Sequence, residues 1–370
     1  MLTTLKLVLL SLCFQAVFAS FAFNPRKYLK SIATCPAVHR AGTQQNSVEI
    51  RLSYVDIDLN PQNRKPSLIM VHGWPGLWST WSNQIQEFWT DYRLIVPNIR
   101  GFGESTHPGG VRSSGTIPDI VGDLVCILQH ASVSSAVCVG HDWGTQVCYE
   151  AARMRPDLFG AVLGAVIPYL PSAGDFVPME HLVSFLPKLG YQLFFDKNTP
   201  EAIAELDKDV RRSIRATLRT VASPPPEEFL KSTASYLIGW DGVDVIPPVP
   251  FFTPEEEDYF VEQYSIQGFK YTLQFYMEEN RRESWSFVQK QGNFSIFQPV
   301  LSILPKNDPV ADWAVASKIL HSPEFLPNLR TKFMDGAHWC HIEHPTQFNA
   351  LMREWLEEVV HTKTAQHDEL

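Results

Sequence analysis

The stretch Val139-Gly140-His141-Asp142-Trp143-Gly144 decides how the rest of the chain is interpreted. An apolar, strand-like run leads into it at 136–139, and a run with helical spacing follows at 145–154. The pattern G-x-D-x-G between two such runs is typical of a sharp strand-to-helix turn that lifts one side chain off the end of a sheet. The lifted residue is Asp142. A carboxylate there indicates attack on an sp³ carbon, which leaves an ester on the enzyme for water to cleave.

The bulk composition is that of a globular protein. Of 370 residues, 45% are hydrophobic and 19% are charged, and this length leaves room for an inserted subdomain. The net charge of −9 and the lack of a basic stripe argue against nucleic acid as a partner. Apolar runs after residue 30 are short, so no transmembrane span is expected. No residue spacing resembles a metal site, and no cofactor is expected.

Both ends of the sequence carry patterns typical of targeting signals. Residues 1–22 contain Lys6, an apolar run and then small residues, which is the pattern of a secretory signal peptide cleaved after Ala19. An uncleaved signal anchor is the alternative, disfavoured by the short apolar run. The last four residues, 367–370, read HDEL, a retrieval signal for the endoplasmic reticulum. We therefore expect a protein of the endoplasmic reticulum lumen that binds a retrieval receptor.

The cysteine count does not define a disulfide framework. Six cysteines are present, and Cys13 leaves with the signal peptide, so at least one of the remaining five is unpaired. Cys126, Cys138 and Cys148 fall on apolar faces of expected helices or strands, which favours small buried thiols. The pairing of the five is left open. Asn293-Phe294-Ser295 is a glycosylation sequon, and its use is also left open.

The first part of the mature chain, 23–170, alternates strand and helix patterns. This alternation predicts an α/β fold with a mostly parallel central sheet and right-handed crossovers. An amphipathic stretch at 47–57 predicts outer strands at the sheet edge. The other expected strands are 67–71, 93–96, 136–139 and 161–166, and the expected helices are 81–89, 117–130 and 145–154.

The pattern changes between residues 171 and 298. Strand-like runs vanish and helical spacing dominates, for example over 199–221 and from residue 253 onward. We interpret this segment as a helical cap inserted into the sheet domain. The second part of the core, 299–366, resumes the alternation. Its expected strands are 299–304 and 330–334, and its final helix is 346–360.

Three reactive residues follow expected strand ends in the order Asp142, Asp308, His338. In a parallel sheet such ends meet at one edge. His338 would be the general base that activates water, and Asp308 would orient its imidazole. Asp312 is a rival for the acid. His341 and His344 are rivals for the base, but they lie where the final helix begins.

A second turn, His72-Gly73-Trp74-Pro75, supplies candidate hydrogen-bond donors. The backbone N–H groups of Trp74 and Trp143 would form an oxyanion hole. Pro75 is a candidate cis proline, as expected in a tight functional turn.

With these residues in place, the chain resembles the soluble epoxide hydrolases of the α/β-hydrolase superfamily. The matching pieces span nearly the whole mature chain and are HGWPG (72–76), RGFGES (100–105), GHDWG (140–144), the Asp308 loop and GAHW (336–339). The resemblance implies an α/β-hydrolase fold with a cap, and two cap tyrosines that donate hydrogen bonds to the epoxide oxygen. These positions match Tyr191 and Tyr276, with Tyr271 as the fallback for the second. The remaining cap tyrosines, including Tyr236, are expected to pack.

The implied reaction turns a small apolar epoxide and water into a vicinal diol. A haloalkane dehalogenase shares the aspartate nucleophile but commonly has an Asn after its His-Gly pair, where this chain has Trp74. A non-catalytic luminal binding protein on the same fold ranks lower, because every member of the constellation is present. A serine esterase is argued against by the absence of Ser from the turn. The physiological epoxide, the enantioselectivity and the oligomeric state stay open.

Overall fold

A computed structural model describes residues 23–59, 62 and 65–367 of the chain. The expected signal peptide, 1–22, and residues 368–370 of the expected retrieval signal lie outside the described residues. Within the described part, no helix is both long and apolar enough to cross a bilayer.

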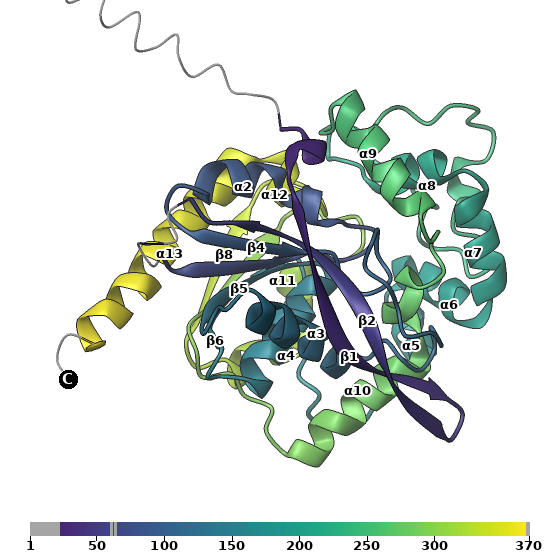
Figure 1. Ribbon diagram of the computed structural model, residues 1–370. Helices are drawn as coiled ribbons and strands as arrows, with labels where there is room; N and C mark the ends of the chain where they lie inside the picture. The colour runs from purple at the N-terminus through teal and green to yellow at the C-terminus, as the bar shows by residue number, and fades with distance from the viewer. Residues whose placement is uncertain (1–22, 60–61, 63–64, 368–370) are drawn as a thin grey trace, which may run out of the picture.

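The core is one eight-stranded sheet with the order β1-β2-β4-β3-β5-β6-β7-β8 (Figure 1). β1 and β2 pair antiparallel, β2 pairs antiparallel with β4, and all other pairs are parallel. The prediction of a mostly parallel sheet is therefore confirmed. The strands are β1 Lys30–Ala41, β2 Gln44–Ile57, β3 Ser67–Val71, β4 Arg93–Pro97, β5 Ala136–His141, β6 Phe159–Ala165, β7 Val300–Pro305 and β8 Leu329–Met334.

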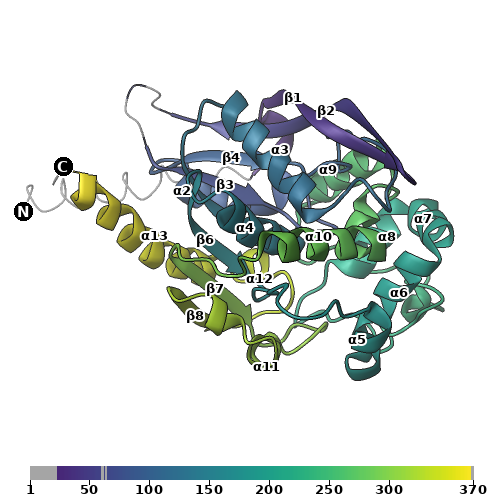
Figure 2. The same ribbon diagram turned by 90° about the horizontal axis from the view of Figure 1, so that it is seen from below.

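Helices cover both faces of this sheet (Figures 1 and 2). α3 (Ile117–His130) and α4 (Trp143–Met154) share one hydrophobic cluster with alternate residues of the central strands. α2 (Ser82–Phe88) and α13 (Pro345–His367) pack on the opposite face in a second cluster. Because the central strands are buried on both sides, they read in the sequence as continuous apolar runs. Short elements η1 Pro25–Lys27, η2 Trp78–Trp81, α11 Trp313–Ile319, η6 Ser322–Phe325 and α12 Cys340–Glu343 complete the core.

A helical segment is inserted between β6 and β7. Figure 1 shows its helices grouped at one side of the sheet, on the right, with α10 running back beneath α3. Its elements are α5 Met179–Phe185, η3 Pro187–Leu189, α6 Gly190–Lys197, α7 Thr199–Lys208, α8 Val210–Thr217, η4 Ile238–Trp240, α9 Pro254–Ser265, η5 Thr272–Tyr276 and α10 Glu278–Gln291.

The expectation of one continuous helix over 199–221 is wrong. The backbone of Asp209 is extended (φ −148°, ψ 91°), and it separates α7 from α8. Its carboxylate accepts a hydrogen bond from the backbone N–H of Arg212 at 2.9 Å, so it caps the start of α8. An Asp side chain competes well for such free N–H groups, which makes it a better N-cap than a helix interior residue.

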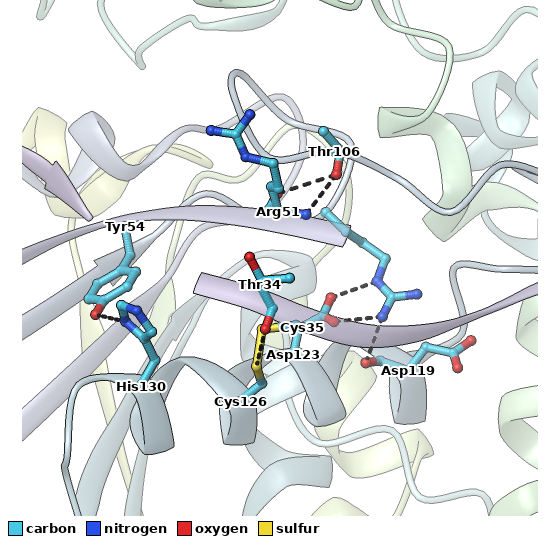
Figure 3. Close-up of a disulfide and its surroundings, with 10 residues drawn as sticks. Thr34, Cys35, Arg51, Tyr54, Thr106, Asp119, Asp123, Cys126 and His130 are labelled. Carbon is cyan, nitrogen blue, oxygen red and sulfur yellow. Dashed lines mark hydrogen bonds and ion pairs between the residues drawn. A yellow bond between two sulfur atoms is a disulfide. The ribbon is translucent and has the colours of Figure 1, made fainter. Parts of the chain in front are cut away.

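The expectation of free buried thiols at Cys126, Cys138 and Cys148 is also wrong. Cys35 on β1 is joined to Cys126 on α3, as Figure 3 shows, and Cys138 on β5 is joined to Cys148 on α4. Only Cys340 is free in the described part of the chain, and it is buried. The periodicity places each cysteine on the correct face, but it does not reveal which residue of the opposing element lies across from it.

Candidate active site

Asp142 stands between β5 and α4 in a backbone conformation that is rare for a residue with a side chain (φ 54°, ψ −127°). The start of α4 lies close to β5 and to the neighbouring strand β3. A Cβ at Gly140 would lie 2.5 Å from the carbonyl oxygen of Gly144, and a Cβ at Gly144 would lie 2.1 Å from that of Val71. Only glycine fits at both positions, so the G-x-D-x-G pattern is a steric requirement of this turn.

Two backbone N–H groups converge on the carboxylate of Asp142. The N–H of Trp74 donates to its Oδ1 at 2.9 Å, and the backbone N–H of Trp143 lowers the pKa of the same carboxyl. Gly73 makes room for this contact, since a Cβ there would lie 2.3 Å from Oδ1. The Trp74–Pro75 peptide is cis, as expected. The two expected oxyanion-hole donors, the backbone N–H groups of Trp74 and Trp143, therefore both interact with the carboxylate of Asp142.

His338 bridges the two expected carboxylates. Its Nε2 lies 3.4 Å from Oδ2 of Asp142, and its Nδ1 lies 2.8 Å from Oδ2 of Asp308. Asp308 also accepts hydrogen bonds from the backbone N–H of Val310 at 2.8 Å and the indole N–H of Trp313 at 2.7 Å. Its side chain is fully buried and its orientation is fixed by three partners.

The rivals for the acid and the base lie elsewhere. Asp312 accepts a hydrogen bond from the N–H of Val315 and caps α11. His341 is buried behind the site, where its ring lies 4.2 Å from that of His141. His344 is partly exposed, with its Nε2 3.8 Å from Glu343. None of the three takes the place of Asp308 or His338.

The charges in this cluster set the protonation states. Burial alone would lower the pKa of His338, but the carboxylates of Asp308 and Asp142 outweigh it and raise the pKa to about 10. Burial would raise the pKa of Asp142, but His338 and the N–H of Trp143 hold it below its usual range. The free site therefore contains two carboxylates and one imidazolium at neutral pH.

The other buried histidines around the site are neutral. Burial lowers the pKa of His72 and of His141 to about 4, and it lowers that of His341 well below its usual value. The Nε2 of His141 lies 2.8 Å from the backbone carbonyl oxygen of His338, so His141 supports the loop that carries the base. His338 is thus the one cationic histidine beside Asp142.

Two tyrosines of the inserted helices face Asp142 across a cavity of about 180 Å³. The rings of Tyr191 and Tyr276 lie 5.6 Å apart. Burial, followed by nearby groups that include the Asp142 charge, raises the pKa of both phenols above the ordinary value. Tyr271 instead stacks on His107, with ring centroids 4.5 Å apart, and does not line the cavity. The structure places Tyr276, and not Tyr271, beside Tyr191.

A third tyrosine in the cavity was expected only to pack. The ring of Tyr236 lies 5.7 Å from that of Tyr191, and its hydroxyl lies 3.1 Å from the hydroxyl of Thr217. Thr217 donates its own proton to the carbonyl oxygen of Ser213 at 2.9 Å, so Tyr236 is the donor of the pair. No sequence signal marks it, because its place depends on how the irregular segment after α8 folds over the cavity.

The cavity walls beyond these groups are mostly apolar. They include Phe229, Leu230, Pro224, Pro225 and Val310, with Trp339 beside the base. Within the described residues, no group of three or more His, Cys, Asp or Glu side chains is arranged to hold a metal ion.

Residues 66–345 match the family described as alpha/beta hydrolase fold. The chain belongs to this family. The chain is 28% identical over 313 residues to "Bifunctional epoxide hydrolase 2" of Sus scrofa, and the match covers 83% of this chain and 53% of that protein. It therefore spans about half the length of the mammalian relatives. "Epoxide hydrolase B" of Mycobacterium tuberculosis is 27% identical over 337 residues, covering 81% of this chain and 93% of that protein.

The fold of the chain is also found among solved structures. Epoxide hydrolase A from Mycobacterium thermoresistibile superimposes with a TM-score of 0.71 at 24% identity, covering 88% of this chain and 98% of that one. This likeness establishes the α/β-hydrolase fold.

Proposed function

We propose that this hydrolase converts an apolar epoxide and water into a vicinal diol through a covalent ester on Asp142. The strand-to-helix turn at 140–144, here called the elbow, carries the buried carboxylate of Asp142. The observation that carries the proposal is that this carboxylate faces two phenols, Tyr191 and Tyr276, across one cavity. The carboxylate is a nucleophile for carbon, and the phenols are acids for the oxygen that leaves. The names of the relatives, which are epoxide hydrolases, support the same reaction.

In the first step, a carboxylate oxygen of Asp142 attacks one epoxide carbon. The new ester C–O bond forms as the ring C–O bond breaks, and the ring oxygen takes a proton from Tyr191 or Tyr276. Alkoxide is strongly basic, with a conjugate acid of pKa about 16 if it resembles bulk water. Phenols with a raised pKa can therefore still protonate it, and they stay un-ionised until the ring opens.

Formation of the ester changes the charge that surrounds His338. Asp142 loses its negative charge, so one of the two carboxylates that raise the pKa of His338 is gone. The imidazolium then becomes acidic enough to return a proton to the tyrosinate. This leaves a neutral imidazole, held by Asp308, next to the ester.

In the second step, neutral His338 takes a proton from water, and the hydroxide oxygen adds to the ester carbonyl of Asp142. The N–H groups of Trp74 and Trp143 donate to the oxyanion that forms. Collapse breaks the ester C–O bond and releases the second diol oxygen, which takes the proton of the added hydroxyl group. The carboxylate of Asp142 and the imidazolium of His338 are restored.

Haloalkane dehalogenation is less well supported by this site. A released halide needs free N–H donors, yet the indole N–H of Trp74 donates to the hydroxyl of Thr272 at 3.2 Å. The indole ring of Trp143 lies edge-on to Tyr276, with ring centroids 5.7 Å apart. Incubation with 1-bromobutane and assay of free bromide separates the two reactions. Bromide release faster than styrene oxide hydrolysis would favour the dehalogenase.

One turnover in ¹⁸O-water tests the proposed mechanism. With enzyme in excess over styrene oxide, the label should appear in the carboxylate of Asp142 and not in the diol, because one diol oxygen is the epoxide oxygen and the other comes from unlabelled Asp142. Asp142→Ala should abolish hydrolysis, whereas the matched variant Asp312→Ala, at the cap of α11, should retain it. Label in the diol after one turnover would rule out the ester.

The protein is also proposed to reside in the endoplasmic reticulum lumen. Two disulfides support an oxidising compartment, and the only sequon of the chain places Asn293 in an exposed position after α10. Expressed in a eukaryotic cell, the chain should lose mass on endoglycosidase H treatment, and Asn293→Gln should not. Deletion of residues 367–370 should send it into the medium if a retrieval receptor binds HDEL. A cytosolic, unglycosylated product would contradict this location.

A further inference from the structure

The Cys138–Cys148 disulfide spans the turn that carries the nucleophile. Cys138 lies on β5, four residues before Asp142, and Cys148 lies on α4, six residues after it. Both cysteines are fully buried. The bond therefore closes a ring of chain whose interior contains the whole elbow turn, including Gly140, Asp142 and the donor residue Trp143.

The disulfide continues a contact that the glycines begin. Cys138 lies two residues before Gly140, so both face α4 from the same side of β5. Cys148 lies four residues after Gly144, about one turn further along the same face of α4. Near the turn, β5 and α4 touch at Gly140, where a Cβ would lie 2.5 Å from the carbonyl oxygen of Gly144. One turn further on, a covalent bond joins the two elements.

A close contact at one point does not by itself fix the direction of a helix, and α4 is also buried along its length, with the amide of Gln298 donating to the carbonyl oxygen of Ala152 at 2.7 Å. Near its start, α4 is also held by the hydroxyl of Thr145, which donates to the carbonyl oxygen of Ala165 at 2.9 Å. This second contact lies at the same end of the helix as the glycines. The disulfide restrains the helix further along. Tilting of α4 would change the direction of the Trp143 N–H and the position of Asp142, which joins strand to helix.

We propose that Cys138 and Cys148 are positioning residues for the reaction, because their disulfide holds the elbow at the angle that aims Asp142 at the substrate. The inference rests on the proposed epoxide hydrolysis. Reacting groups that are displaced by about 1 Å can lose about 100-fold in rate, so a restraint on this turn acts directly on ester formation.

The second disulfide of the chain is a matched control. Cys35 and Cys126 join β1 to α3, and none of the site residues lies on either element. Figure 3 shows that bond between the edge strand and the helix, with Asp123 on the same helix. Cys35 is buried in the same hydrophobic cluster as the elbow disulfide, and Cys126 packs against that cluster. Its loss therefore removes a comparable cross-link without touching the elbow.

The test compares Cys138→Ala/Cys148→Ala with Cys35→Ala/Cys126→Ala at a temperature well below the unfolding transitions of both. Rapid-quench single turnovers of styrene oxide, read by intact mass, give the rate of ester formation and the substrate dissociation constant separately. For the elbow variant, we expect ester formation to slow by about tenfold or more while the dissociation constant changes by less than about twofold. The control variant should form the ester at the wild-type rate.

Wild-type ester formation by the elbow variant would overturn the proposal, and so would an equal loss in the control variant. If the double alanine variant does not fold, the wild-type chain prepared and assayed under reducing conditions replaces it. It should then be slower than oxidised wild type by the same factor. NMR titration of His338 gives a readout that needs no substrate, because Asp142 contributes to its raised pKa. That pKa should shift only in the elbow variant, even if styrene oxide is not turned over.

Discussion

His338 is an imidazolium in the free enzyme because the carboxylates of Asp142 and Asp308 both face it, at 3.4 and 2.8 Å. With a pKa of about 10, it keeps its proton throughout the neutral range. A permanent cation would be a poor base for activating water. The proposed mechanism resolves this conflict, because the attack of Asp142 removes one of the two charges. The base is then available only after the ester exists.

This coupling predicts that the ester accumulates in acid. Attack needs ionised Asp142, whose pKa lies below its usual range, so attack continues at pH 5. Hydrolysis needs neutral His338. The pKa of His338 in the ester is lower than in the free enzyme, and as pH falls below it the neutral fraction shrinks and hydrolysis slows. Rapid-quench mass spectrometry should detect more ester at pH 5 than at pH 8.

A control variant sharpens that experiment. His338→Gln cannot act as the base at any pH, so its ester should accumulate equally at pH 5 and pH 8. Turnover that slows in acid without any increase in ester would contradict the assigned order of steps, since the attack would then be the step that fails.

The two phenols opposite Asp142, those of Tyr191 and Tyr276, are the proton donors of the proposed mechanism. Tyr276→Phe removes a proton donor while keeping the ring that packs against Trp74 and Tyr191. General acid catalysis contributes roughly 10²–10⁴-fold, so kcat/KM for styrene oxide should fall by about 100-fold or more. Tyr271→Phe is the matched control and should stay near wild type, because Tyr271 stacks on His107 outside the cavity. A large loss of kcat/KM in Tyr271→Phe with none in Tyr276→Phe would instead identify Tyr271 as the second proton donor.

Single residues of the site were predictable to different degrees. Asp142, Asp308 and His338 follow strand ends, and parallel strands bring their ends to one edge, so their meeting could be inferred from order alone. Tyr236 could not be found in this way. It lies in an irregular stretch between α8 and η4, and no periodic pattern says that this stretch lines the cavity.

At the scale of elements, a buried ion pair attaches the loop after β4 to α3. The guanidinium of Arg100 makes two hydrogen bonds of 2.6 Å to the carboxylate of Asp123, and both side chains are buried. Arg100 also donates to the carbonyl oxygens of Ser114 and Asp119. Although Arg100 follows a strand end, as the site residues do, its partners give it a structural role.

Removal of this carboxylate should cost stability and not chemistry. Asp123→Ala leaves the buried Arg100 cation unpaired, which typically costs about 3–5 kcal/mol of the free energy of unfolding. Urea denaturation should show this loss, while kcat at 25 °C remains close to wild type for the folded fraction. In the control Asp157→Ala, which removes the exposed partner of Arg155, the unfolding midpoint should not change measurably. Equal midpoints for the two variants would refute the structural role of Arg100.

The elements themselves were largely visible in the sequence. Strands such as β3 and β5 are buried on both faces and appear as apolar runs, and α3 begins at a capping box formed by Thr116 and Asp119. β1 was not predicted as a separate strand, because it is an edge strand with partly exposed residues and an irregular apolar pattern. The break between α7 and α8 was missed because apolar spacing continues across Asp209.

Within the described part of the molecule, two disulfides restrain the core in different ways. Cys35–Cys126 joins residues 91 apart and holds an edge strand to α3, whereas Cys138–Cys148 joins residues only 10 apart around the elbow. Neither pairing follows from the sequence, since the six cysteines of the chain admit many combinations and separation along the chain does not reveal contact in space. The fold that brings each pair together had to be known first.

Removal of the longer-range disulfide, Cys35–Cys126, should therefore cost more stability, whereas removal of Cys138–Cys148 should slow ester formation more. Restriction of the unfolded chain grows with the length of the closed loop, and the chain-entropy relation gives about 4.5 kcal/mol for the longer loop and about 2.7 kcal/mol for the shorter one. Urea denaturation should show a larger loss for Cys35→Ala/Cys126→Ala than for Cys138→Ala/Cys148→Ala, with the m-value checked to exclude changes in the unfolded state. Ester formation should show the reverse ranking, because only the shorter loop contains Asp142. If the same variant were worse in both measurements, the elbow disulfide would be one more stabilising cross-link, and the angle between β5 and α4 would be set by Gly140 and Gly144 alone.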